Sequence, residues 1–445
     1  MDQLIAPGQR LRLVGSGATV TVEQRIGAGG QGVVHAVRLG DAPFAVKWFR
    51  PALRQDEFRA CIEALVARGR PPHAAFVWPI DLVEQTERGR PGDGAAGFGY
   101  LMRLVEPRFV PIPQVLNERQ QPSFRVLATI GRELVEAMAA LHAAGLCYRD
   151  FSFGNVWVDP LTAQVAVLDN DNIGSEGGGV FVKGTGRFMA PEILRDEALP
   201  STVTDLHSLA VLLFFVLVHG HPLLGARVDS SYTWEGGGQP SELELLLEHF
   251  GRRPLFVFDP HDAANRPVPG DRMLLWWELY PEFVRQAFTR AFTVGLRDAS
   301  LGGRVTEGVW RRVLQRLHDS VWSCPRCGAE VFHDQERPGG TCWACQAPLP
   351  VPPLLRLPAG RVLVLGERAV LTDLHLTGGR GVATVVGRVE PHPGRPGQVV
   401  LRNVGDHPWR VVPDGETMKA VQPGQRLGVR PMTVDFGAAR GWITG

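Results

Sequence analysis

The sequence predicts an α+β protein built from four consecutive parts. Residues 10–105 contain short segments in which apolar and polar side chains alternate, as in β-strands, and one helical segment near residues 53–67. From residue 123 to about 320, apolar residues recur at intervals of three and four, which predicts a mainly helical region. Two pairs of cysteines follow within residues 321–348. Residues 354–445 return to strand and turn patterns, which predicts a small all-β, sandwich-like domain.

Length and composition are those of a globular protein with more than one domain. The chain has 445 residues, of which 44% are apolar and 21% are charged. A net charge of +1 creates no bulk field for nucleic acid, so we expect no nucleic-acid partner. The longest apolar run, residues 209–218, is too short to span a bilayer. The first residues lack the pattern of a signal peptide, so we expect a cytoplasmic protein.

Lysine is rare in this chain, which draws attention to the positions where it occurs. Only three of the 47 basic residues are lysine: Lys47, Lys183 and Lys419. Lys47 lies in the apolar, strand-like run 44–49 and follows a glycine-rich segment. Glycines without side chains allow the backbone to close over phosphate oxygens. Taken alone, the glycine pattern fits a hairpin turn equally well.

Downstream of the long helical segment, polar residues occur in an order suited to phosphoryl transfer. Asp150 and Asn155 are five residues apart, and Asp169 ends the strand-like run 165–169. A carboxylate can accept the proton of an attacking hydroxyl, while an amide oxygen and a second carboxylate can bind Mg²⁺. Residues 184–192 then contain Thr185 and an Ala-Pro-Glu sequence.

Together these blocks resemble eukaryotic-like protein kinases of bacteria over about residues 20–318. The resemblance extends to Glu192 of the Ala-Pro-Glu sequence, to Asp205 at the head of an apolar helix, and to Arg304, which would pair with Glu192. It implies a bilobal kinase fold over residues 1–320, with lobes at about 10–105 and 106–320. It also implies ATP and Mg²⁺ as cofactors and phosphate transfer to serine or threonine of a protein substrate, including the kinase itself.

The resemblance assigns a role to each matching residue. Lys47 would bind the phosphates of ATP, Asp150 would be the catalytic base, and Asn155 and Asp169 would bind magnesium. Further contacts with the nucleotide would come from residues of the glycine-rich loop and from the residue behind adenine: Gly27, Gly29, Gly32, Val34 and Met102. Thr185 would brace Asp150, as in serine/threonine kinases.

A kinase lysine normally pairs with a glutamate on the helix that follows it, and this helix offers two. Glu57 and Glu63 point about 120° apart, so only one can face Lys47. The usual spacing from the lysine favours Glu63, which we therefore predict as the catalytic partner.

Three departures from the kinase pattern concern the transferred phosphate and the metal. Ser152 and Gly154 stand where kinases carry a cation, and Lys183 is a candidate to supply that charge, although it is equally consistent with a solvated loop residue. Asn170 and Asp171 replace the usual Phe-Gly and add a carboxylate beside the metal. The alternative to an active kinase is a pseudokinase scaffold that binds nucleotide and docks partners. The intact lysine, catalytic aspartate and metal ligands favour the active enzyme.

The cysteine pairs have the spacing of a zinc ribbon. Two Cys-x-x-Cys motifs separated by fourteen residues can place four thiolates around one zinc ion, with no open position for water. The predicted ligands of this structural zinc are Cys324, Cys327, Cys342 and Cys345. Disulfides are disfavoured, because nothing in the chain indicates an oxidising compartment.

The last part of the chain gives weaker signals. Residues 348–353 form a proline-rich linker. Residues 354–445 faintly resemble forkhead-associated domains, which bind phosphothreonine, but lack the Ser-x-x-His signature of that family, so an ordinary docking domain is favoured. Kinase and zinc ribbon together resemble bacterial kinases that occur with a von Willebrand-type domain protein and a PP2C-type phosphatase. That resemblance implies these two proteins as partners.

Overall fold

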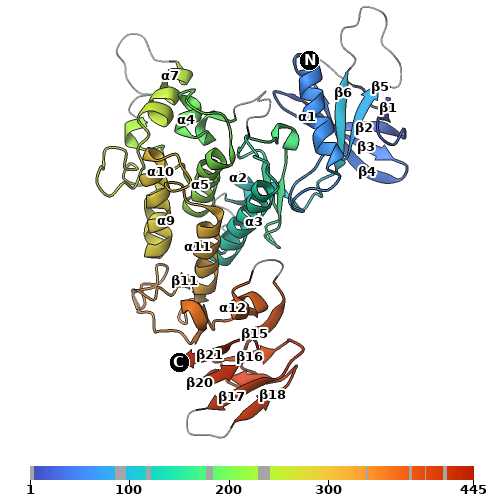
Figure 1. Cartoon of the computed structure of the whole chain (residues 1–445). Helices are drawn as coiled ribbons and strands as arrows, with labels where there is room; N and C mark the ends of the chain where they lie inside the picture. The colour runs from blue at the N-terminus through green and yellow to red at the C-terminus, as the bar shows by residue number, and fades with distance from the viewer. Residues whose placement is uncertain are drawn as a thin grey trace, which may run out of the picture. The chain divides into compact units, whose positions relative to one another are not determined.

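The computed structural model describes residues 5–85, 97–116, 122–176, 184–228, 241–336, 339–379, 383–395, 397–413 and 418–444 (Figure 1). The chain folds as two compact units. Unit 1 comprises Met1–Pro122, Ile130–Asp271 and Phe288–Gly308, and unit 2 comprises Ser123–Thr129, Arg272–Ala287 and Val309–Gly445. Within the described ranges, no helix combines the length and apolar character needed to cross a membrane.

Unit 1 begins with a closed barrel in the order β1-β2-β3-β4-β6-β5. Its strands are β1 (Arg10–Leu13), β2 (Thr19–Ala28), β3 (Gly32–Leu39), β4 (Ala42–Phe49), β5 (Asp81–Gln85) and β6 (Phe98–Arg103). The glycine-rich segment spans the end of β2 and the start of β3. Gly32 is required there, because a Cβ atom would lie 2.4 Å from the carbonyl oxygen of Trp48.

Helix α1 (Asp56–Ala67) is the helix predicted near residues 53–67. It starts later than predicted because Pro51–Leu53 form a separate 3₁₀ turn. Its buried residues are Phe58, Ile62 and Leu65, which recur at intervals of four and three and form its inner face.

The helical part of unit 1 follows the apolar periodicity of the sequence. The long helix predicted after residue 123 is α3 (Phe124–Ala143), and the apolar run 209–218 belongs to the buried helix α5 (Thr202–Val218). Ser201 caps α5, since its hydroxyl accepts a hydrogen bond from the amide of Thr204. The shorter helices with members in unit 1 are α2 (Ile112–Val115), α4 (Pro191–Leu194), α7 (Glu242–Leu246), α9 (Glu282–Phe292) and α10 (Val294–Arg297).

A three-stranded sheet in the order β7-β8-β9 carries the catalytic loop. Its strands are β7 (Val110–Pro111), β8 (Val156–Val158) and β9 (Val165–Val167). Asn155 immediately precedes β8, and Asp169 lies just past the end of β9. Because β8 and β9 pair antiparallel, with Val156 opposite Val167, these two residues emerge at the same end of the sheet. The predicted pair of Arg304 and Glu192 is also present, buried at 2.5 Å.

Unit 2 contains the cysteine module and a domain of two sheets, together with α8 (Arg272–Leu279) and most of α11 (Glu307–Ser320). The cysteine module has the hairpin β10 (Val321–Ser323) and β11 (Glu330–Phe332). One sheet has the order β13-β12-β21-β20-β17-β18, and the other has the order β14-β15-β16-β19. Apolar residues from both sheets form one core, which includes Leu355, Val434, Ile443, Leu371 and Leu401.

The bounds of these strands and of the helix between them follow the chain closely. They are β12 (Leu354–Arg356), β13 (Val362–Val364), β14 (Val370–Thr372), α12 (Asp373–Thr377), β15 (Val385–Pro391), β16 (Val399–Asn403), β17 (Trp409–Pro413), β18 (Lys419–Val421), β19 (Arg426–Gly428), β20 (Met432–Asp435) and β21 (Arg440–Thr444).

The proline-rich segment 348–353 joins parts of unit 2 that pack on one another. Trp322, Cys324 and Cys342 share an apolar cluster with Leu354 and Val364 of the first two strands of the sheet domain. The cysteine module and the sheet domain therefore have a common packed interface within this unit.

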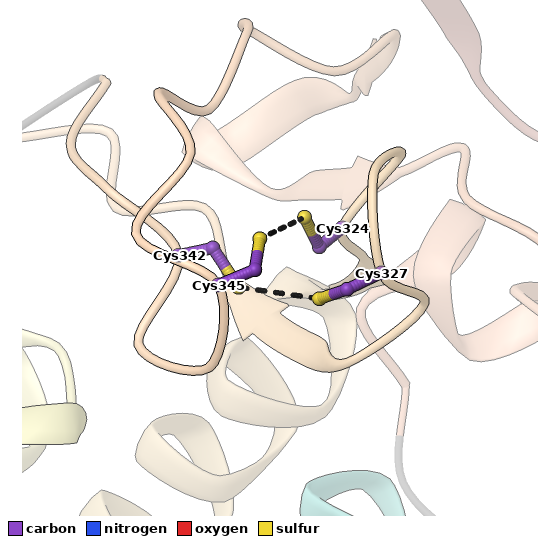
Figure 2. Close-up of side chains that lie close together, drawn as sticks. All are labelled: Cys324, Cys327, Cys342 and Cys345. Carbon is purple, nitrogen blue, oxygen red and sulfur yellow. Dashed lines mark hydrogen bonds between the residues drawn. The ribbon is translucent and has the colours of Figure 1, made fainter.

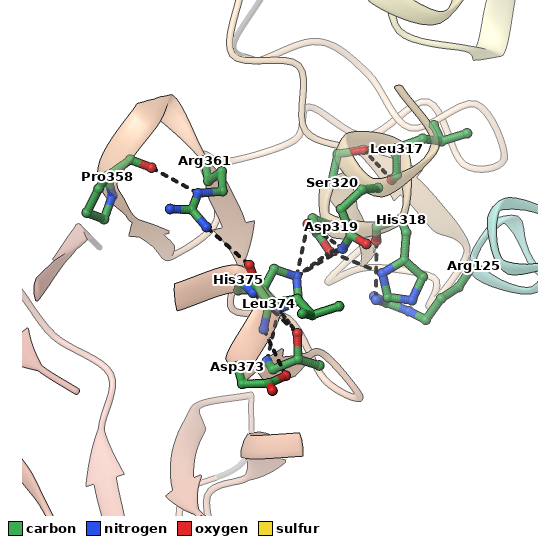
Figure 3. Close-up of polar contacts among 12 residues, drawn as sticks. Arg125, Leu317, His318, Asp319, Ser320, Pro358, Arg361, Asp373, Leu374 and His375 are labelled. Carbon is green, nitrogen blue, oxygen red and sulfur yellow. Dashed lines mark hydrogen bonds and ion pairs between the residues drawn. The ribbon is translucent and has the colours of Figure 1, made fainter. Parts of the chain in front are cut away.

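A buried carboxylate joins the end of α11 to α12 (Figure 3). Asp319 accepts hydrogen bonds from Gln315 at 2.8 Å, His318 at 3.1 Å and His375 at 3.1 Å. Burial alone would raise the pKa of Asp319, but the charges and hydrogen bonds of His375 and His318 hold it well below its usual range. Arg361 donates to the carbonyl oxygen of Leu374 at 3.1 Å and fixes α12 from its other side.

Candidate active site and cysteine cluster

Lys47 lies in β4, between β3 and β6, with its ammonium group buried. It donates hydrogen bonds of 2.9 Å to Oε1 of Gln31, to Oδ1 of Asp169 and to both carboxylate oxygens of Asp171. Burial alone would lower the pKa of Lys47, but the charges of Asp171 and Asp169 raise it above its usual value. The lysine is therefore held charged in the interior by two carboxylates.

The predicted pairing of Lys47 with Glu63 is wrong for this structure. Glu63 binds Arg59 at 2.9 Å, and its side chain is 50% exposed. Glu57 is also exposed. The physical reason is the face that α1 presents: its buried residues are apolar, so both glutamates lie outside that face. Arg59 also binds Glu84 of β5 at 2.6 Å, which keeps its salt bridges at the surface.

Asp150, the predicted catalytic base, is held by two side chains from later in the sequence. Its Oδ1 accepts a hydrogen bond from Thr185 at 2.9 Å, as the sequence predicted. Its Oδ2 accepts one from Asn172 at 3.1 Å. Burial raises the pKa of Asp150, and the hydrogen bond from Thr185 opposes that rise. A carboxylate with a raised pKa is a better proton acceptor than an exposed one.

The backbone of the catalytic loop is fixed from the side of α5. Asp205 accepts hydrogen bonds from the amides of Tyr148 and Arg149, and its side chain also contacts His142 at 3.2 Å. The hydroxyl of Tyr148 donates to the carbonyl oxygen of Leu168 at 2.6 Å, which links the loop to the segment before Asp169. The aromatic residue at this position therefore braces the loop.

His142 is itself charged by its surroundings. Burial alone would lower its pKa, but its contacts with Asp205 and Glu307 raise the pKa to about 9. The imidazolium thus bridges α3, α5 and the start of α11.

Two non-glycine residues at the site adopt left-handed backbone conformations. Arg149 has a φ of 72° and Asp169 a φ of 54°. Residues other than glycine, asparagine and aspartate rarely occupy this region, and such conformations concentrate at functional sites. Gly184 has a φ of +119°, and a Cβ there would lie 2.6 Å from the carbonyl oxygen of Arg149, so only glycine fits before Thr185.

The donor atoms suit a magnesium ion and a nucleotide. The amide nitrogen of Asn155 donates to the carbonyl oxygen of Asp150 at 3.0 Å, so its oxygen is the end left for a cation. Asp169 is 37% exposed and gives one oxygen to Lys47. Oxygen ligands of this kind match Mg²⁺. Apolar side chains suitable for an adenine ring gather around Met102, namely Val34, Ala45, Leu104 and Leu168.

Two residues of the site were missed by the sequence analysis. Gln31 of the glycine-rich segment binds Lys47 through its amide oxygen and donates to Asn172 at 3.1 Å. Asn172 in turn binds Asp150. The glycines marked the loop, but no feature of the sequence showed that its glutamine points inward. Lys183 lies outside the described residues.

The four predicted zinc ligands come together (Figure 2). Their sulfur atoms all lie within 4.8 Å of one another. Cys324 and Cys345 are 3.8 Å apart, Cys327 and Cys342 are 3.7 Å apart, and all four are free thiols rather than disulfides. A tetrahedral zinc ion with Zn–S bonds of about 2.3 Å requires sulfurs about 3.8 Å apart. The cluster therefore has the dimensions of a structural zinc site.

Comparison with known proteins agrees with this geometry. A family model described as protein kinase domain matches residues 20–238. The serine/threonine-protein kinase AfsK of Streptomyces coelicolor is 26% identical over 262 residues, which cover 56% of this chain and 30% of AfsK. The probable serine/threonine-protein kinase PkwA of Thermomonospora curvata is 27% identical and covers 50% of this chain and 29% of PkwA.

A further relative is matched over more of its length. The serine/threonine-protein kinase PkaB of Streptomyces coelicolor is 24% identical over 306 residues, 65% of this chain and 63% of PkaB. The chain thus spans about 30% of AfsK, the family model matches residues 20–238, and those residues hold the lysine, the catalytic loop and the metal-binding aspartate. Residues 20–238 are a protein kinase domain related to those of bacterial serine/threonine kinases.

Proposed function

We propose that this chain is an ATP- and magnesium-dependent kinase that phosphorylates serine or threonine of a protein, including itself. The observation that carries the proposal is the arrangement around Asp150 and Asp169. One carboxylate is positioned by Thr185 and Asn172, and the other contacts a buried lysine. These are the groups that phosphoryl transfer needs on the two sides of the reacting phosphate.

Each residue has a chemical task in this proposal. Bound ATP and magnesium supply the γ-phosphoryl group and neutralise its charge. Asp150 orients the substrate hydroxyl and takes its proton, and burial suits it to that role by raising its pKa. Asn155 and Asp169 hold the metal, and Lys47 offers a buried positive charge to the phosphates. Thr185 on Asp150 supports serine or threonine as the acceptor.

The test is incubation of the full chain with labelled ATP and Mg²⁺, with and without a bacterial protein extract. Asp150→Asn is expected to reduce transfer on the order of 10³-fold, because it removes the base while keeping the shape. Asp41→Asn, at an exposed position of unit 1, is the matched control and should transfer phosphate normally. Phosphoamino-acid analysis should return phosphoserine or phosphothreonine. Nucleotide binding by the wild type with no transfer to any protein would favour the scaffold instead.

We also propose that the cysteine cluster holds one structural zinc ion per chain. The support is the match between the sulfur separations and a tetrahedral site, with all four positions filled by thiols. The partners implied by resemblance, a von Willebrand-type domain protein and a PP2C-type phosphatase, remain a prediction. Binding of phosphopeptides by residues 354–445 likewise remains a prediction.

A further inference from the structure

Asp171 has an unusual environment for a carboxylate. Its side chain is fully buried, with 0% exposure, and both of its oxygens lie 2.9 Å from Nζ of Lys47. The hydroxyl of Tyr100 lies 3.5 Å from Oδ1. Tyr100 is the cross-strand neighbour of Lys47 on β6, so the carboxylate is enclosed by the strands that carry the lysine.

Burial makes this pair mutually dependent. An ionised carboxylate or ammonium in the interior is costly unless its partner is present, and removing one partner leaves the other uncompensated. Asp169 also contacts Lys47, but it is 37% exposed and is a ligand for magnesium in the proposed function. Asp171 is the carboxylate that can remain on the lysine when Asp169 turns to the metal.

Helix α1 offers Lys47 no competing carboxylate in this structure. Its inner face is Phe58, Ile62 and Leu65, and Glu63 is paired with Arg59 at the surface. Asp171 instead lies in the 3₁₀ turn Asn170–Asn172, directly after Asp169. The partner of the lysine and the metal-binding residue are therefore parts of one short segment.

We propose that Asp171 is the positioning residue for Lys47, in the place that a glutamate of helix α1 would fill. The inference rests on the proposed function for its link to ATP. It assigns the placement of the lysine to the segment after β9, so that the position of α1 does not determine it. Gln31 adds a neutral contact to the same ammonium group.

The scarcity of lysine allows a direct test. With only Lys47, Lys183 and Lys419 in the chain, ¹³Cε-lysine labelling gives three signals, which Lys183→Arg and Lys419→Arg assign. Asp171→Asn should shift the Lys47 signal of the full chain, whereas Glu63→Gln should leave it in place. A Lys47 signal that follows Glu63→Gln and ignores Asp171→Asn overturns the inference.

A folding cycle covers the case in which Asp171→Asn perturbs the structure. Lys47→Met and Asp171→Asn should each lower the melting temperature, because each leaves one buried charge without its partner. The double variant should recover most of the loss, since both charges are gone. Strictly additive losses would show that the two residues are not coupled, and would reject the inference.

Kinetics then separates the inference from the function on which it rests. Asp171→Asn should lower kcat by about 100-fold, with a smaller change in the KM for ATP, and Glu63→Gln should stay near wild type. Coupling in the cycle without phosphate transfer by the wild type rejects the proposed function and keeps Asp171 as the partner of Lys47. Transfer that Asp171→Asn leaves unchanged rejects the inference and keeps the function.

Discussion

The active site and the cysteine cluster are built in opposite ways. In the active site, contacts join residues that are far apart in sequence: Lys47 and Asp171 are separated by 124 positions, and Gln31 and Asn172 by 141. In the cysteine cluster, each Cys-x-x-Cys turn closes on itself. The amide of Cys324 donates to Ala329, and the amide of Cys342 donates to Ala347 in the same way.

The two turns also share their backbone geometry. Gly328 and Gln346 each follow the second cysteine of a pair, and both have positive φ angles, of 76° and 57°. Two short segments therefore suffice to present four thiols, while the kinase site exists only when the barrel and the catalytic loop are both folded. The cluster should fail locally, and the kinase site should fail through single contacts between distant elements.

The largest expected effect breaks the cluster. Cys342→Ser removes a ligand whose side chain is also part of the apolar cluster with Trp322. Because structural zinc contributes folding energy directly, we expect a loss of several kcal/mol in unit 2 and zinc well below one per chain. Metal analysis and hydrogen exchange over residues 321–364 measure both.

The barrel of unit 1 should keep its protection from exchange in this variant. Cys61→Ser, which changes a thiol on α1 instead, serves as the control and should retain the zinc. A Cys342→Ser protein with full zinc and unchanged exchange would contradict the assignment of the cluster.

The next effect sharpens the comparison by testing a long-range contact of unit 1. His142 has a folded pKa of about 9 against an ordinary 6.5, because Asp205 and Glu307 hold its charged form. The stability from this contact is complete below about pH 6.5 and is lost as the pH rises through about 9. It amounts to on the order of 3 kcal/mol.

Urea unfolding of the wild type and of His142→Gln across this pH range provides the measurement. The variant should be less stable at low pH and should lose this part of the pH dependence. His261→Gln, at an exposed position, is the control. Parallel pH profiles for the wild type and His142→Gln would refute a charged His142.

The smallest effect concerns one hydroxyl. Thr185→Ala removes the hydrogen bond to Asp150 and should reduce transfer about tenfold, the value of a single hydrogen bond to a charged group. Thr185→Ser keeps the hydroxyl and should restore most of the rate. If alanine and serine behave alike, the hydroxyl does not position Asp150.

The sequence predicted elements well where the apolar period was long. The helix expected over residues 123–144 is α3, Phe124–Ala143, because its inward positions repeat over many turns. The four cysteines were predicted as one cluster because their local spacing fixes the geometry. The same periodicity on α1 places Phe58, Ile62 and Leu65 inside, and it already contained the reason why neither glutamate faces the barrel.

The partners of Lys47 could not be predicted in the same way. Asp171 was noted only as an additional carboxylate near the metal. Its pairing depends on a 3₁₀ turn after β9 and on a left-handed Asp169, neither of which leaves a period in the sequence. Gln31 points inward because of the path of the glycine-rich segment, and that path is a property of the folded barrel.

The contact between Asp319 and His375 determines where this chain can be divided. A chain ending in the proline-rich segment would keep Asp319 of α11 but lose His375 of α12. It would also expose the face of Trp322 that packs with Leu354 and Val364. The apparent linker is therefore a poor place to cut, and a transplantable catalytic unit has to carry the two sheets with it. In evolutionary terms, the tail is inherited as part of the fold of α11, not as a detachable appendage.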